Sequence, residues 1–193
     1  MTVELVDWQL MDDAPFKKNA KYADLYSIPD TWVGELIDGD LYAFPRPRST
    51  HGRLVTRLGQ QLERSDNERP EGWIILTDVE IWFGKHLLVP DACGWRRSRM
   101  PEMPDVATFR LAPDWVCEGL SPSTARLDKG RKREIYEKAG VGHVWYADPA
   151  LHTIDVFVLE NKQYKLVASV GGDKRVKLAP FTHAIDLAKL WQR

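Results

Sequence analysis

The sequence predicts a single α/β domain in which a mixed β-sheet is flanked by helices. Its 193 residues suffice for one compact domain with a sizeable core and are too few for two full-sized ones. Apolar patterns typical of helices and of strands follow one another along the chain, as in mixed sheets covered by helices. The 44% hydrophobic and 28% charged content is that of an ordinary globular protein, which excludes a fibrous or wholly disordered chain.

The N-terminal third is predicted to hold an arm, two short helical or hairpin elements and one long helix. Residues 1–16 show no apolar period and are assigned to an N-terminal arm, so the domain itself is predicted to span residues 17–193. These elements are a short helix over 17–26 that ends before Pro29, a hairpin over 34–42 that turns at Asp38-Gly39, and a helix from Ser49 or Thr50 to about Arg64 with leucines at 54, 58 and 62 on one stripe.

The rest of the chain alternates between strands and helices. Residues 73–83 and 87–95 are each predicted to form one strand, and residues 115–120 a short continuous strand. The later elements are predicted to be a helix over 128–139 that ends at Gly140, a strand over 143–146, a hairpin of 154–159 with 164–169, and a helix over 184–191.

Composition excludes several classes of protein. The 27 basic and 28 acidic side chains nearly cancel, which argues against a uniformly positive surface but allows a local basic face. Cys93 and Cys117 lack the paired spacing of a zinc site and are predicted to be buried thiols. No apolar run approaches the roughly 20 residues of a membrane span, and the acidic N-terminus is unlike a secretory signal. We therefore expect a cytoplasmic protein.

Two carboxylates stand in strands that are otherwise apolar. Glu118 shares one strand face with Val116 and Leu120, because side chains alternate between the faces of a strand. Asp91 lies among the apolar residues of the predicted strand over 87–95. A buried carboxylate needs a cationic partner or a metal. Two of them on neighbouring strands suit Mg²⁺, which is held by one or two carboxylates together with water and phosphate oxygens.

A lysine on the helix that follows completes this constellation. Lys132 falls on the apolar stripe with Ile135, Tyr136 and Ala139, at helical steps of three, four and seven. A lysine there would orient an attacking water or, as the neutral amine, deprotonate it; as the ammonium it would stabilise charge on a phosphate.

Several stretches of the sequence carry a resemblance to a known family. They are Gly34–Gly39, Val89–Asp91, Trp115–Thr124, Asp128–Arg133 with Tyr136 and Gly140–Val141, and Val144–Pro149. From about Tyr22 to Trp191 the chain resembles the Uma family of putative restriction endonucleases, a bacterial domain family within the PD-(D/E)XK nuclease superfamily.

The resemblance implies a restriction-endonuclease-like core and a hydrolase that cuts DNA with Mg²⁺ or Mn²⁺, and it implies a homodimer. Asp91 matches the motif aspartate and Glu118 the motif acid. Leu120 stands where the superfamily has its lysine, and Lys132 matches the lysine that this family carries on the following helix. Gly119 replaces a branched residue. Glu35 matches a family glutamate, which implies a further metal or water ligand.

Each of these residues also has a structural interpretation. Glu118 with Lys132 can form a buried ion pair without a catalytic role. Glu35 can pair with an arginine, and Glu80, a further candidate metal ligand, can be structural. A basic surface is predicted to follow a phosphate backbone; its residues are Arg46, Arg48, Arg53, Arg57, Arg96, Arg97, Arg99, Arg126, Lys129, Arg131, Lys132 and Arg133. The competing functions are a nuclease-fold module that binds nucleic acid or a partner without cleaving, and, ranked last, a carboxylate-based sugar hydrolase.

Overall fold

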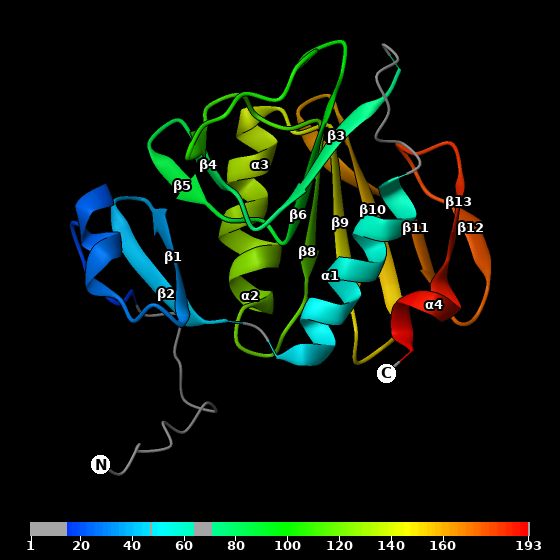
Figure 1. The fold of residues 1–193 in the computed structure, drawn as a ribbon, viewed down its shortest axis with the longest axis horizontal. Helices are drawn as coiled ribbons and strands as arrows, with labels where there is room; N and C mark the ends of the chain where they lie inside the picture. Colours follow the sequence, from blue (N-terminus) through cyan, green and yellow to red (C-terminus); the bar gives the residue numbers. More distant parts are fainter. Residues whose placement is uncertain (1–14, 47, 64–70, 193) are drawn as a thin grey trace.

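The computed structural model describes residues 15–46, 48–63 and 71–192. The predicted arm lies outside this part except for its last two residues. The chain forms two larger mixed sheets, a two-stranded ribbon and a few helices (Figure 1).

The five-stranded sheet contains the first hairpin. Its order is β2 (Asp40–Pro45), β1 (Trp32–Ile37), β5 (His86–Leu88), β4 (Glu80–Phe83) and β7 (Thr108–Phe109). Only β4 and β7 run parallel; the other neighbours are antiparallel. The predicted turn at Asp38-Gly39 is confirmed, with φ of 57° and 88°, the left-handed values that a two-residue hairpin turn requires.

The six-stranded sheet forms the centre of the molecule. Its order is β11 (Gln163–Gly171), β10 (Thr153–Glu160), β9 (His143–Asp148), β8 (Trp115–Gly119), β6 (Ala92–Arg96) and β3 (Trp73–Thr77). β8 and β9 run parallel, and every other pair is antiparallel. The ribbon of β12 (Arg175–Lys177) with β13 (Ala184–Asp186) follows.

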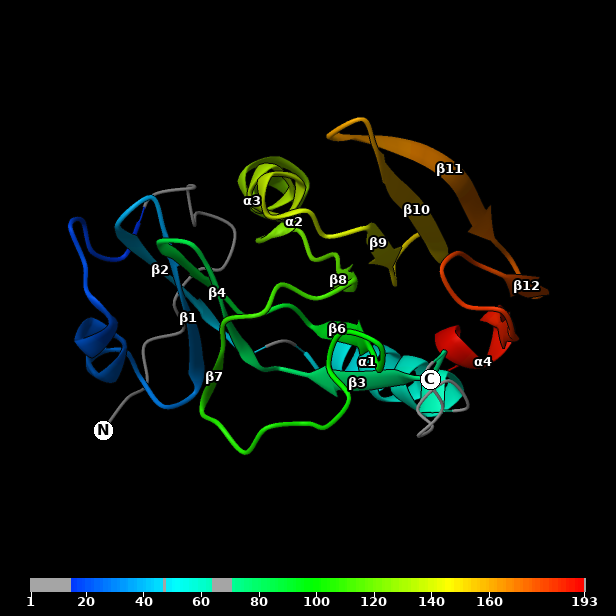
Figure 2. The same cartoon turned by 90° about the horizontal axis from the view of Figure 1, so that it is seen from above.

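Helices cover both faces of the six-stranded sheet. They are α1 (Ser49–Leu62), α2 (Ala125–Leu127), α3 (Arg133–Ala139) and α4 (Leu187–Trp191), with a π-helical turn over Asp128–Lys132 between α2 and α3. A 3₁₀ helix over Tyr22–Ser27 packs against the five-stranded sheet. Figure 2 shows α3 on one side of the sheet and α1 with α4 on the other. α3 ends at Gly140 as predicted, with φ of 77°.

Each face of the six-stranded sheet packs in a hydrophobic core of its own. Leu54, Leu58 and Leu62 of α1 pack with Trp115 and Trp145, which confirms the predicted leucine stripe. On the other face, apolar side chains of α3 pack against residues from both larger sheets. Both cysteines are free and buried. No helix in the described part of the chain is long and apolar enough to span a membrane.

Two predicted strands are wrong, because each is divided between the two sheets. The predicted strand over 73–83 breaks at Asp78, whose φ of 53° turns the chain from β3 into β4. The one over 87–95 breaks at Val89–Asp91 between β5 and β6, since Pro90 has no N–H to donate to a ladder. Asp91 therefore lies at a crossing between sheets. The predicted helix over 184–191 is also wrong in its first three residues, which form β13.

Candidate functional site

One buried ammonium is surrounded by three carboxylates. The Nζ of Lys132 lies 2.8 Å from Oε1 of Glu118, 3.1 Å from Oε1 of Glu35 and 3.2 Å from Oδ1 of Asp128. All four side chains are at most 5% exposed. Glu35 belongs to β1, Glu118 to β8, and Asp128 with Lys132 to the π-helical turn. We call these four residues the Lys132 cluster.

Further hydrogen bonds fix the orientation of the carboxylates. The hydroxyl of Tyr136 donates to Oε1 of Glu118 at 2.5 Å, and the backbone N–H of Val89 donates to Oε1 of Glu35 at 2.8 Å. The π-helical turn places Asp128 four residues before Lys132, so that both side chains point from the helix toward the sheets. π-helical turns are rare and are frequent at functional sites.

The charges of the Lys132 cluster do not balance. Burial raises the pKa of Glu118, Glu35 and Asp128, and the charge of Lys132 opposes this effect. Burial also lowers the pKa of Lys132, but attraction to the carboxylates outweighs it and holds that pKa well above its ordinary value. Three carboxylates share one ammonium, which favours a proton or a second cation nearby.

Asp91 lies beside this cluster at the ends of β6 and β8. Ala92, the residue after Asp91, pairs with Cys117 in the antiparallel register, and the charge of Asp91 contributes to the raised pKa of Glu118, so the two carboxylates lie near each other. Oδ2 of Asp91 accepts the N–H of Gly119 at 2.6 Å, and Oδ1 is 2.8 Å from Nε2 of His51. The side chain of Asp91 is 19% exposed, so it is the part of the constellation that solvent reaches most readily.

A cavity of about 180 Å³ opens onto Asp91. It is lined by His51, Gly52, Val55, Thr56, Thr77, Asp78 and Asp91. Burial and the charge of Asp91 raise the pKa of Asp78. Sequence reasoning did not identify Asp78 or Asp128 as members of the site. The spacing of four between Asp128 and Lys132 was a usable signal, whereas nothing local distinguishes Asp78.

A second cavity, of about 440 Å³, lies on the other side of Asp78. Its walls are Tyr22, Leu25, Tyr26, Ile28, Pro29, Asp30, Trp32, Val33, Gly34, Arg46, Asp78, Glu80 and Val89. Glu80 accepts a hydrogen bond from the hydroxyl of Tyr22 at 2.8 Å and does not line the cavity at Asp91. The structure thus brings Glu35, Glu118 and Lys132 into contact and Asp91 beside them, while Glu80 contacts other residues.

Two carboxylates are available here as ligands of a metal. Asp91 precedes β6 and Glu118 lies on β8, the charge of Asp91 contributes to the raised pKa of Glu118, and each carboxylate oxygen has a second lone pair for a further partner. Within the described ranges, no group of three or more His, Cys, Asp or Glu side chains is arranged to hold a metal ion. Mg²⁺ or Mn²⁺ here would need water and phosphate oxygens to complete its coordination.

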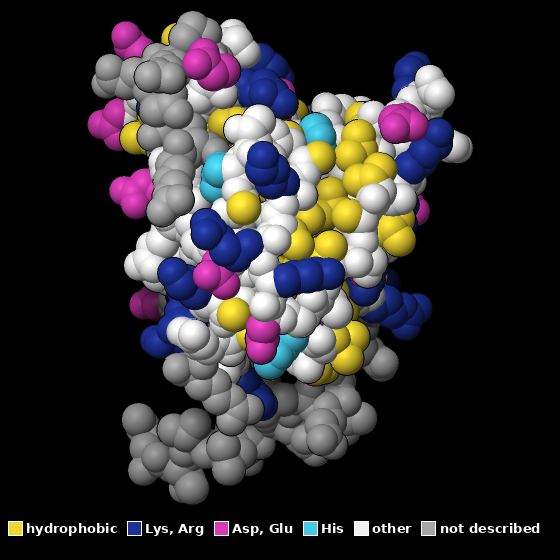
Figure 3. Space-filling view, turned by 90° about the vertical axis from the view of Figure 1, so that its right-hand side faces the viewer, with side chains coloured by type: hydrophobic (Ala, Val, Ile, Leu, Met, Phe, Trp, Pro, Cys, Tyr) yellow, Lys and Arg dark blue, Asp and Glu magenta, His cyan; other side chains and the backbone are white. Residues whose placement is uncertain are grey.

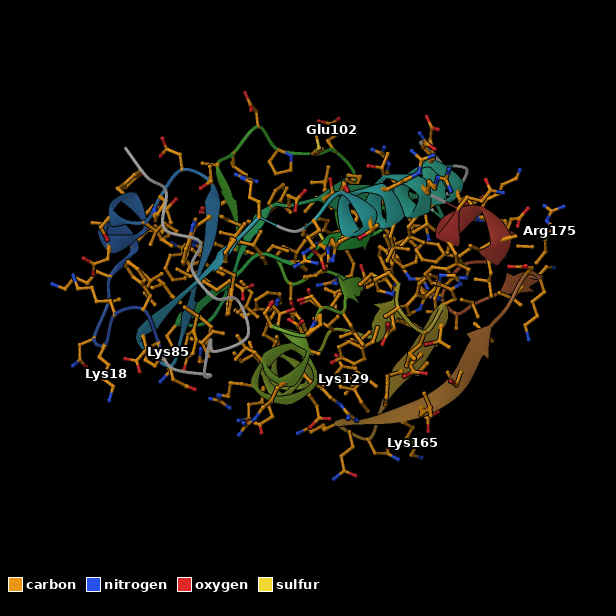
Figure 4. All side chains as sticks on the ribbon, turned by 90° about the horizontal axis from the view of Figure 1, so that it is seen from below. Lys18, Lys85, Glu102, Lys129, Lys165 and Arg175 are labelled. Atoms are coloured by element: carbon orange, nitrogen blue, oxygen red, sulfur yellow. The ribbon has the colours of Figure 1, made fainter. Side chains whose placement is uncertain are left out.

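Most side chains of the predicted basic surface already contact other groups of the protein. Arg57 donates to the carbonyls of Lys189 and Gln192 at the end of α4, and Arg131 pairs with Asp38. Arg99 pairs with Asp114, and Arg133 lies over the ring of Phe157. Arg46 is exposed at the rim of the second cavity. Lys129 is exposed beside the helix of α2 and α3 in the view from below (Figure 4). A phosphate backbone thus meets fewer free cations than the sequence suggests.

Comparisons with known proteins agree with this architecture. A crystal structure described as a putative nuclease belonging to DUF820 from Anabaena variabilis ATCC 29413 superposes with a TM-score of 0.69. It is 22% identical and covers 88% of this chain and 96% of its own, so the likeness shows a shared fold. No curated protein matches the sequence. The family model Uma2, described as putative restriction endonuclease, matches residues 19–188, and the chain belongs to this family.

Proposed function

We propose that the protein is a metal-dependent endonuclease of the PD-(D/E)XK type that hydrolyses phosphodiester bonds of DNA. The observation that supports the proposal is the Lys132 ammonium 2.8 Å from Glu118, with Asp91 hydrogen-bonded to the N–H of the next residue, Gly119. Membership of a family of putative restriction endonucleases supports DNA as the substrate.

In this proposal Asp91 and Glu118 hold Mg²⁺ or Mn²⁺. When bound, the ion supplies positive charge to the phosphate and lowers the pKa of a bound water. Lys132 stays protonated, because its pKa is raised well above the ordinary value, so it acts as a fixed cation that stabilises developing negative charge and not as a base. Glu35 orients that cation, since its Oε1 lies 3.1 Å from Nζ. The contacts of Glu80 give no support for its role as a ligand.

A cleavage assay tests the proposal. Plasmid, linear and branched DNA would be incubated with Mg²⁺ or Mn²⁺ and either the wild type or Asp91→Asn, which keeps the shape of the side chain. We expect the variant to lose at least about 100-fold in rate, as for removal of an essential electrostatic group. The matched control is Asp155→Asn on β10, where Asp155 accepts only a hydrogen bond from Ser169. Equal cutting by the wild type and Asp91→Asn would reject the assigned site.

A module that binds without cleaving is the second candidate. Two observations favour it: Glu118 and Lys132 form a buried ion pair, and Leu120, in the position of the superfamily lysine, is only 6% exposed in the core. Calorimetry with Mn²⁺ separates the two candidates. A folded protein that binds no Mn²⁺ and cuts no DNA would favour the module.

We also propose a homodimer. β11 lies at the edge of its sheet, and its free side offers backbone groups to a second strand. Leu166 and Val167 on β11 are 54% and 50% exposed, and hydrophobic side chains gather on the side of the molecule where β11–β13 lie (Figure 3). Light scattering after gel filtration should give twice the chain mass, and Leu166→Lys should reduce it to one chain.

A further inference from the structure

The imidazole of His51 is held between Asp91 and Gly119. His51 lies in the first turn of α1 and is only 8% exposed. Its Nε2 is 2.8 Å from Oδ1 of Asp91. The sequence alone favoured a packing or capping histidine and left a contact with phosphate open, because nothing near His51 in the chain suggests Asp91 as its partner.

Gly119 provides the space that this ring occupies. A Cβ atom at position 119 would lie 3.1 Å from both ring nitrogens of His51 and 2.6 Å from its Cε1, and the latter is closer than Cβ atoms approach other atoms in proteins. The ring would have to move, since it is the movable end of a side chain and β8 is paired on both sides. The contact with the His51 ring thus accounts for a glycine at position 119, where the family pattern has a branched residue.

The same two residues bind both oxygens of one carboxylate. The N–H of Gly119 donates to Oδ2 of Asp91, and Nε2 of His51 faces Oδ1. A carboxylate accepts hydrogen bonds, so Nε2 carries the proton in this contact. Asp91 is therefore anchored from β8 and from α1 at once, and its carboxylate cannot rotate without breaking one of the two bonds.

The other ring nitrogen points to a role beyond packing. Nδ1 of His51 is buried and has no hydrogen-bond partner in the described part of the chain. A buried polar atom without a partner costs about 1–3 kcal/mol. An apolar side chain would fill the same volume without that cost, so packing alone does not account for a histidine here.

We propose that His51 is a positioning residue that fixes Asp91 in its orientation toward Glu118, and that Gly119 makes this contact possible. The inference deepens the proposed function, because it concerns how the site holds its metal. Hydrogen-bond partners of metal ligands typically contribute about 10–100-fold to metal affinity or activity.

Calorimetric titration with Mn²⁺ is the first test. We expect His51→Ala to weaken binding about 10–100-fold, and His51→Gln, whose amide can still donate to Asp91, to recover most of the loss. His86→Ala is the matched control, since His86 contacts the backbone of Asp38 and no site residue. Melting temperatures identify variants that fail to fold. Equal affinity for the wild type and His51→Ala would overturn the inference.

Gly119→Ala provides an independent test. It should weaken Mn²⁺ binding in the wild-type background and have no further effect in His51→Ala, because both changes remove the same contact. Additive losses would overturn the inference.

A ¹⁵N NMR spectrum of the histidine rings tests the contact between His51 and Asp91 without any metal. The signal of Nε2 of His51 should be that of a protonated nitrogen in the wild type, and it should shift in Gly119→Ala. If the wild type binds no Mn²⁺ but this signal is present, the proposed metal site fails and the positioning contact stands. Without the signal, the contact itself is rejected.

Discussion

Lys132 Nζ and Glu118 Oε1 lie 2.8 Å apart with both side chains almost fully buried. Neither ion has enough water around it to be stable alone, so each depends on the other. This pair joins the helical layer to the central sheet, and it is at the same time the contact through which the proposed chemistry would act. Stability and activity are therefore expected to change together in variants of this pair.

Replacing Lys132 by Met should destabilise the protein by about 3–5 kcal/mol at pH 7, because it leaves three buried carboxylates without their cation. Without that cation, the pKa of the buried carboxyl groups rises further above their values in the unfolded chain. Groups with a raised pKa lose their contribution as the pH rises, so the variant should regain stability relative to the wild type as the pH falls toward 5.

Urea unfolding at pH 7 and pH 5 measures this difference. The control is Arg131→Met, at the neighbouring position, where the ion pair is solvent-exposed and should contribute less than about 1 kcal/mol. A loss in Lys132→Met that is the same at both pH values would contradict the assignment of the charges.

Tyr136→Phe should cost about 1.5–3 kcal/mol in stability, since it removes a hydrogen bond to a charged group. The hydroxyl stabilises ionised Glu118, so its loss should also raise the pKa of that carboxyl and slow cleavage. Tyr164→Phe removes a buried hydrogen bond to the carbonyl of Val141 and should cost about 0.5–1.5 kcal/mol without changing cleavage. Urea unfolding and rate assays on both variants would show whether the two effects separate.

Asp38→Asn should alter stability by less than about 1 kcal/mol at neutral pH, because the pair with Arg131 is largely exposed. Arg131 lowers the pKa of Asp38 in the folded state. A lowered pKa gives stability above the unfolded pKa that is lost as the pH falls through the folded one. Unfolding curves of the wild type and the variant should therefore differ at pH 7 and converge as the pH falls through the folded-state pKa of Asp38.

Arg46→Ala should weaken DNA binding and reduce the salt slope of log Kd by about 1, as expected when one phosphate contact is lost. Arg57→Ala should not, because its guanidinium already donates to carbonyls at the end of α4. Fluorescence anisotropy at 50–200 mM salt compares the two variants. Equal effects of the two variants would contradict the assignment of Arg46 as a phosphate contact.

The sequence predicted local elements well, but it did not reveal that two of the predicted strands are each divided between the two sheets. Leu54, Leu58 and Leu62 define α1 because helical spacing is visible within a few residues. The apolar alternation from Trp73 to Phe83, by contrast, continues across Asp78, and only the backbone angle of that residue separates β3 from β4. Alternation records which face a side chain takes and carries no information on which sheet receives the strand.

In the candidate site, too, local spacing indicated some contacts, and others arise only from the fold. The position of Lys132 on the apolar stripe indicated contact with a buried acid, and Glu118 was the acid in the neighbouring predicted strand. The packing of His51 against Gly119 was not predictable, because it joins residues far apart in the chain through a space that exists only in the folded protein.

Because Glu35 belongs to one sheet and Glu118 to the other, the Lys132 ammonium forms an ion pair with each of the two larger sheets through a single atom. Separating the two sheets would leave the buried carboxylates without their cation, so we expect the two sheets to unfold together. Amide protons of Leu36 on β1 and Val116 on β8 should then exchange with solvent at similar rates, and the contacts of the Lys132 cluster should be lost only when the fold is lost.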